Sequence, residues 1–114
     1  MIIMLFSWLL LGHLVGDFLF QNRWMAEGKA NRWLPLLVHS LVYTATVTVC
    51  ALAAGGLTWR GILIIFLAHL VLDRRVFVNW WAKNITQSQD VPWLVIMIDQ
   101  SWHIVILAVA TLIG

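Results

Sequence analysis

The chain has little charge and almost no cysteine. Only 11% of its 114 residues are charged, whereas an ordinary soluble domain is roughly a quarter charged. The single cysteine, Cys50, excludes an internal disulfide framework and a cysteine-based zinc site. The sequence also contains no glycine-rich phosphate loop, no serine nucleophile elbow and no Cys-x-x-Cys pair. The net charge of +2 is scattered between apolar segments, so we expect no nucleic-acid partner.

Apolar residues make up 62% of the chain, and the mean hydropathy is +0.91. A helix that crosses a bilayer needs about 20 mostly apolar residues. Four stretches meet this requirement, at about residues 2–20, 35–54, 59–80 and 92–113. The first stretch lacks the positive start and the cleavage site of a signal peptide, so we expect a retained helix. The sequence therefore predicts an all-α integral membrane protein, with residues 1–114 forming a single four-helix transmembrane domain in the lipid bilayer.

The basic residues predict how this domain is oriented. Three of them lie in the first connection and three at or after the end of the third span, whereas the middle turn has only Arg60. Cytoplasmic loops are enriched in lysine and arginine. We therefore expect the first and third connections in the cytoplasm and both termini outside it. The polar residues 21–33 should form a short amphipathic helix or loop along the cytoplasmic interface.

The sequence contains an internal repeat. Residues 13–17 read His-Leu-Val-Gly-Asp and residues 69–73 read His-Leu-Val-Leu-Asp. Trp24 and Trp80 each follow eleven residues after the histidine of their copy. This match predicts that the four-helix bundle consists of two repeated helical hairpins of the same sense.

All four histidines and three of the five acidic residues lie inside the predicted spans. A charged carboxylate at the centre of a bilayer costs roughly 2.5–3.5 kcal/mol even on the lenient insertion scale. Such groups are therefore expected to converge on one another or on a bound species. The seven are His13, Asp17, His39, His69, Asp73, Asp99 and His103.

Their spacing supports convergence. Residues four apart lie on the same face of a helix. The first and third spans read His-x-x-x-Asp, and the fourth, which runs in the opposite direction, reads Asp-x-x-x-His. Every aspartate is thus expected nearer the cytoplasm and every paired histidine one turn deeper. His39 lies four residues after Pro35, which places it at a comparable depth.

Imidazole and carboxylate together suit zinc, manganese, iron or nickel. Zinc, the expected metal, takes about four ligands. All seven residues are candidate metal ligands, which is more than one zinc ion requires. Either two ions bind, or one ion binds and some members orient the ligands by hydrogen bonds. A proton or ion pathway and a purely structural polar cluster are the alternatives.

Three further assignments concern the neighbourhood of this cluster. Arg74 and Arg75 are candidates to hold a phosphate or lipid headgroup, with topology or a salt bridge to Asp73 as the alternative. A carboxylate that is not a ligand would act as general base, and Asp17 and Asp99 are the candidates. Tyr43 is expected to serve packing.

Four motifs resemble those of a bacterial and phage family of small multi-pass membrane proteins of unknown function. They are His-Leu-Val-Gly-Asp-Phe-Leu-Phe-Gln-Asn-x-Trp-Met-Ala at residues 13–26, His-Ser-Leu-Val-Tyr at 39–43, His-x-x-x-Asp-Arg at 69–74 and Ile-Asp-Gln-x-x-His at 98–103. The pattern is similar, more distantly, to that of membrane-bound metal-dependent hydrolases. The resemblance implies a multi-pass protein of the bacterial inner membrane and names no reaction.

The leading functional prediction is a membrane-embedded metal-dependent hydrolase that acts on an amphiphilic, lipid-like or phosphate-ester substrate from the cytoplasmic leaflet. The alternative is a divalent-cation or proton transporter or channel that uses the same cluster, with a homo-oligomer supplying the path. A phage or host membrane-lesion protein is a third option, but it would not need matched histidine and aspartate pairs.

Overall fold

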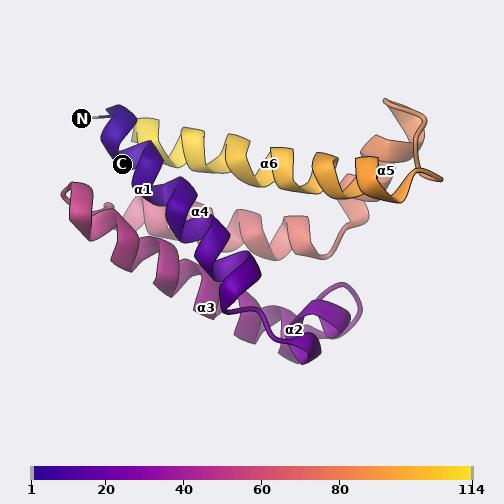
Figure 1. The fold of residues 1–114 in the computed structure, drawn as a ribbon, viewed down its shortest axis with the longest axis horizontal. Coiled ribbons are helices and arrows are strands. Elements are labelled where there is room, and N and C mark those ends of the chain that lie inside the picture. Colours follow the sequence, from indigo (N-terminus) through magenta and orange to yellow (C-terminus); the bar gives the residue numbers. More distant parts are fainter. Residues whose placement is uncertain (1, 114) are drawn as a thin grey trace.

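The computed structural model describes residues 2–113, which form helices joined by turns and contain no strand. Figure 1 shows their arrangement. The long helices are α1 (Ile2–Leu14), α3 (Trp33–Ala51), α4 (Trp59–Asp73) and α6 (Pro92–Ile113). The short ones are α2 (Arg23–Gly28) and α5 (Val76–Asn84). A π-helix, η1 (Val15–Leu19), extends α1, and a 3-10 turn, η2 (Leu52–Ala54), extends α3.

Three helical stretches are long and apolar enough to cross a membrane: Ile2–Leu19, Trp33–Ala54 and Pro92–Ile113. They correspond to the spans predicted at residues 2–20, 35–54 and 92–113. The predicted interfacial segment at residues 21–33 contains the short helix α2, whose first turn is capped by the side chain of Asn22.

The span predicted at residues 59–80 is not one continuous helix. Helix α4 ends at Asp73, Arg75 adopts a left-handed backbone conformation with φ of 65°, and α5 begins at Val76. This conformation is costly for a residue other than glycine. The turn lets α5 fold against α6, where it buries Val78 and Ala82 together with Ile98. The apolar burial offsets the cost of the turn.

Helix α1 packs against α3 and α6, and α4 also packs against α3 and α6. Their shared apolar core includes Leu9, Val47, Ile65 and Leu107. Gly12 lets α1 approach closely, because a Cβ atom there would lie 2.8 Å from the Cα atom of Val47. The start of α1 and the end of α6 lie at one end of the molecule, while α2 and α5 lie at the other (Figure 1).

The outward faces of the long helices are apolar. Ile3, Val49, Leu67 and Leu112 are 81%, 65%, 50% and 74% exposed. An exposed apolar surface on every long helix is costly in water and suits contact with lipid. The polar residues that the sequence analysis singled out lie instead between the helices.

Candidate metal centre

The seven ionisable residues converge between four helices, as their spacing predicts. Each is between 0 and 2% exposed. They lie on neighbouring elements that pack together: α1 with η1, α3, α4 and α6. The seven are His13 on α1, Asp17 on η1, His39 on α3, His69 and Asp73 on α4, and Asp99 and His103 on α6.

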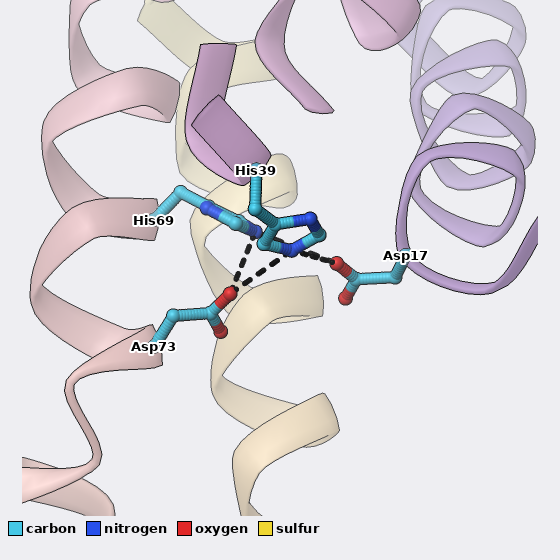
Figure 2. Close-up of side chains that lie close together, drawn as sticks. All are labelled: Asp17, His39, His69 and Asp73. Atoms are coloured by element: carbon cyan, nitrogen blue, oxygen red, sulfur yellow. Dashed lines mark hydrogen bonds and ion pairs between the residues drawn. The ribbon is translucent and has the colours of Figure 1, made fainter. Parts of the chain in front are cut away.

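Four of them form the first ligand group: Asp17, His39, His69 and Asp73. Figure 2 shows their side chains pointing toward one another. The Nε2 atom of His39 lies 3.0 Å from Oδ1 of Asp17 and 3.1 Å from Oδ2 of Asp73. The Nε2 atom of His69 lies 3.4 Å and 3.3 Å from the same two oxygens. Each imidazole therefore faces both carboxylates.

These separations fit the space around a bound metal ion. Zinc binds nitrogen and oxygen at about 2.0–2.2 Å, so ligand atoms at the corners of a tetrahedron lie about 3.3–3.6 Å apart. The four separations above are close to that value. One ligand atom from each residue can be chosen so that all four lie within 4.8 Å of one another.

Buried polar atoms without hydrogen-bond partners also indicate a place for a metal ion. The Oδ2 atoms of Asp17 and Asp73 are buried without a hydrogen-bond partner among the described residues, as is Nε2 of His103. The Oδ2 atom of Asp73 has imidazole nitrogens nearby, but their geometry is not that of a hydrogen bond. Buried polar groups are nearly always hydrogen-bonded. The buried cluster could therefore hold a metal ion.

A second ligand group consists of Asp73, Asp99 and His103. The Nε2 atom of His103 lies 3.0 Å from Oδ1 of Asp73, whereas Oδ2 of Asp73 faces the first group. Asp73 thus presents one oxygen to each group. This arrangement could hold one ion or two ions that share a carboxylate.

Hydrogen bonds hold two of the imidazoles in place. The Nδ1 atom of His69 lies 3.0 Å from Oγ of Ser40. The Nδ1 atom of His103 lies 2.7 Å from the carbonyl oxygen of Asp99, to which it can only donate. When Nδ1 carries the proton, the lone pair on Nε2 is free for a metal. The Asp99 carbonyl therefore leaves Nε2 of His103 as the nitrogen that could bind a metal, whereas the Ser40 hydroxyl can donate to Nδ1 of His69 or accept from it and fixes only the orientation of that ring.

His13 lies next to the cluster but belongs to neither ligand group among the described residues. Its Nδ1 atom lies 2.7 Å from the Tyr43 hydroxyl, and its Nε2 atom lies 2.7 Å from Oε1 of Gln100. Both ring nitrogens are thus engaged, which is the arrangement expected of a residue that orients its neighbours. Its role as a ligand stays a prediction.

Tyr43 has more contacts with the cluster than its expected packing role implied. Its ring stacks on that of His69 with 3.9 Å between centroids. It also lines a cavity of about 10 Å³ together with His69 and His103, and a cavity of that size holds about one water molecule. Tyr43 follows His39 by four residues, so the helical spacing itself could have identified it.

Lys29 was also missed as a cluster residue. Its Nζ atom lies 3.3 Å from Oδ2 of Asp73, and its side chain is only 9% exposed. The residue precedes α3 in the polar segment, where a lysine predicts only the cytoplasmic side of the membrane. No sequence spacing connects it with Asp73, because the contact depends on how the connection folds over the end of α4.

The structure separates the two arginines predicted to bind a headgroup. The Nη2 atom of Arg75 lies 3.9 Å from Oδ2 of Asp99, beside the cluster. The Nη1 atom of Arg74 donates instead to the carbonyl oxygen of Ala30. Arg74 therefore does not join Arg75 beside the cluster. The alternative, a salt bridge from an arginine to Asp73, is not formed among residues 2–113 either, because Lys29 pairs with Asp73.

Comparisons with known proteins add the family of the chain. No curated protein and no solved structure matches it. The family model that does match covers residues 5–114, nearly the whole chain, and includes all seven cluster residues. The chain belongs to the family described as "Protein of unknown function (DUF3307)".

Proposed function

We propose that the chain is a membrane-embedded metal-dependent hydrolase of the bacterial inner membrane, acting on a lipid-like or phosphate-ester substrate at the cytoplasmic leaflet. The observation that carries this proposal is the division of Asp73 between two buried ligand groups. A carboxylate shared in this way would fix the three-residue group, which has room for a water molecule, beside a second, fully liganded metal ion.

The two groups suit different tasks. The first offers four protein ligands, Asp17, His39, His69 and Asp73, which is the closed set typical of structural zinc sites. The second offers three, Asp73, Asp99 and His103, which leaves a position for water. We assign zinc to both, and a zinc ion in the second group would activate that water and polarise the substrate bond.

Asp99 suits the role of general base better than Asp17. Oδ1 of Asp17 lies near both His39 and His69, so that oxygen is committed to the first group. Each of the two carboxylates keeps one buried oxygen without a hydrogen-bond partner among the described residues, Oδ2 in Asp17 and Oδ1 in Asp99, but only Asp99 belongs to the three-residue group that has a position for water. A carboxylate that uses one oxygen for a metal can accept a proton on the other.

The charge of the cluster favours an anionic substrate. Three carboxylates face the two cationic side chains Lys29 and Arg75. With neutral imidazoles this leaves one excess negative charge, and the two zinc ions assigned above would turn it into an excess of three positive charges. A phosphate anion would reduce this excess in a setting where unbalanced charge is costly. The headgroup would enter beside Lys29, whose segment closes one end of the cluster.

The proposal places α1, α3, α4 and α6 across the bilayer as a four-helix bundle of two repeated hairpins. Helix α4 has 15 residues and is about 22 Å long at about 1.5 Å per residue. It is shorter than the roughly 30 Å hydrocarbon core, a mismatch that local thinning of the bilayer accommodates. Asp73 and the arginines at its end would then lie near the interface.

The test is hydrolysis by purified, zinc-loaded protein. Bis(4-nitrophenyl) phosphate and phosphatidylglycerol vesicles serve as probes, with release of nitrophenolate or of a phosphate monoester measured. We expect turnover that a chelator abolishes and that His103→Ala lowers by at least about a hundredfold, while Ser101→Ala, on the exposed face of α6, stays active. Absence of turnover on both probes, or full activity of His103→Ala, would contradict the proposal.

A divalent-cation or proton transporter is the second candidate, and the closure of the cluster favours it. The seven side chains are at most 2% exposed, and the adjacent cavity holds about one water molecule. A small ion reaches such a site more easily than a lipid. Zinc or proton flux into proteoliposomes, abolished by Asp73→Asn and without turnover of either ester, would support the transporter instead.

A further inference from the structure

A groove of about 860 Å³ runs along the outer side of the junction between α4 and α5. Its floor is formed by apolar side chains, among them Leu67, Leu70, Val71 and Phe77. Pockets that bind small molecules occupy about 300–1,000 Å³. The groove exists because the chain turns at Arg75, so that α5 leaves the axis of α4.

The groove lies outside the metal centre. His69 and Asp73 occupy the buried side of α4, whereas Leu67 and Val71 are 50% and 61% exposed on its outer side. The two features therefore use opposite sides of one helix. An occupant of the groove would not displace a metal ligand.

One cation lies in this otherwise apolar groove. The guanidinium carbon of Arg74 lies 4.0 Å from the centre of the Trp33 ring, and Nη1 donates to the carbonyl oxygen of Ala30. Along residues 2–113, no carboxylate lies within 4.0 Å of this guanidinium. Stacking and the carbonyl fix its position, but they leave other N–H donors unused and the positive charge unneutralised.

Trp33 and Trp80 also line the groove and are 70% and 51% exposed. Exposed tryptophans of membrane proteins gather at the level of the lipid headgroups. An apolar groove at that level with a fixed, unneutralised guanidinium is complementary to a molecule that has an apolar chain and an anionic headgroup. We propose that this groove binds an anionic phospholipid, with an acyl chain along Leu67 and Val71 and the phosphate at Arg74.

The chain contains a matched control at the other end of α4. The guanidinium carbon of Arg60 lies 5.5 Å from the centre of the Trp59 ring. A smaller groove of about 390 Å³, lined by Trp59, Thr44 and apolar residues of α3 and α4, lies beside this pair. Arg60 is exposed and is not among the residues that line it. Arg60→Gln therefore removes an arginine stacked on tryptophan without removing a cation from a groove.

The experiment is native mass spectrometry of the full chain in detergent, titrated with phosphatidylglycerol or phosphatidylcholine of identical acyl chains. One basic residue near a membrane surface favours an anionic lipid by about fivefold. We expect that preference in the wild type and in Arg60→Gln, and its loss in Arg74→Gln. Val71→Trp, which fills the groove from an exposed position, should weaken binding of both lipids. Glycerol phosphate, which lacks acyl chains, should not compete.

Equal affinity of the wild type for the two lipids would overturn the proposal. So would a full phosphatidylglycerol preference in Arg74→Gln, or an equal loss in Arg60→Gln. Displacement by glycerol phosphate would replace the lipid site with a simple phosphate site. Zinc content measured on the same samples keeps this result separate from the proposed hydrolase, because Arg74→Gln should retain its metal whichever way lipid binding turns out.

Discussion

At the scale of single residues, Asp73 connects the features of the site. Its Oδ2 atom lies 3.1 Å and 3.3 Å from the imidazoles of His39 and His69, and its Oδ1 atom lies 3.0 Å from that of His103. Lys29 adds a fourth contact, at 3.3 Å. A substitution at this position therefore affects both ligand groups at once.

Asp73→Asn should lose bound metal. The amide cannot supply the negative charge that two ligand groups share, so zinc affinity should fall by more than the roughly 10–100-fold that loss of an orienting partner costs. Elemental analysis of protein purified in mild detergent measures the stoichiometry. Asp90→Asn is the control, because Asp90 is an exposed loop residue. Undiminished metal in Asp73→Asn would remove this carboxylate from the ligand set.

Ser40→Ala tests whether imidazole orientation matters. Without the hydroxyl that lies 3.0 Å from Nδ1, the His69 ring loses the partner that aims Nε2 at the cluster. We expect zinc affinity to fall by about 10–100-fold with the fold retained. Competition with a fluorescent zinc chelator gives the affinity. Among residues 2–113, the Ser101 hydroxyl donates only to a carbonyl of its own helix, so Ser101→Ala should bind zinc as the wild type does.

Lys29→Met should have the opposite effect. The ammonium group lies 3.3 Å from a candidate ligand oxygen, where it repels a bound cation. Its removal should raise zinc affinity by at least about tenfold and lower the melting temperature of the metal-free protein, because Asp73 then loses its counter-ion. The same chelator competition measures the change. Lys83 is exposed, so Lys83→Met should change neither the zinc affinity nor the melting temperature. A fall in zinc affinity for Lys29→Met would show that the ammonium group supports the metal and does not compete with it.

The sequence predicted which residues converge better than it predicted what each one does. The high cost of ionisable groups in lipid and their four-residue spacing were enough to bring seven residues together. The roles depend on neighbours from other helices. His13 is engaged by Tyr43 of α3 and Gln100 of α6, at 2.7 Å each, and no pattern within α1 could reveal either contact.

At the scale of elements, hydropathy located three stretches correctly and misjudged the fourth. The helices ending at residues 19, 54 and 113 match the predicted spans because each is one uninterrupted apolar run. Residues 59–80 also read as mostly apolar, but the chain turns at Arg75 so that α5 can pack against α6. That turn depends on tertiary packing, and it also creates the groove beside Arg74.

Close approach of α1 to α3 should be needed to bring Asp17 to the centre. In Gly12→Ala the new Cβ atom would lie 2.8 Å from the backbone of Val47, so the helices must separate. We expect a loss of about 1–3 kcal/mol in unfolding free energy, measured by thermal or denaturant unfolding in detergent. Weaker zinc binding should accompany it.

Gly61→Ala is the matched control for this change. Its Cβ atom would meet the far end of the flexible Leu57 side chain at 3.3 Å, which can move aside. Alanine is also the better helix former, so the variant should be at least as stable as the wild type. Equal stability of Gly12→Ala and Gly61→Ala would contradict the role of close packing between α1 and α3.

At the scale of the whole molecule, apolar outer faces surround a buried polar centre. Helices α2 and α5 both lie toward the end opposite the start of α1 and the end of α6, on different sides of the molecule (Figure 1). Six of the seven basic residues belong to the first and third connections or to α4's end and α5. The fold thus gathers positive charge at one end, which is the asymmetry that sets orientation in a membrane.

Single cysteines in a Cys50→Ser background test both the orientation and the fourth crossing. Ala53, beside the middle turn, is exposed, as are Asn31 and Gln89 in the first and third connections. A membrane-impermeant maleimide should label Ala53→Cys in intact spheroplasts, but Asn31→Cys and Gln89→Cys only after permeabilisation. The reversed pattern would place the positively charged end outside the cytoplasm and move the proposed substrate to the other leaflet. Labelling of Ala53→Cys and Gln89→Cys from the same side would show that α4, with its 15 residues, does not cross, because the two positions flank this helix in the chain.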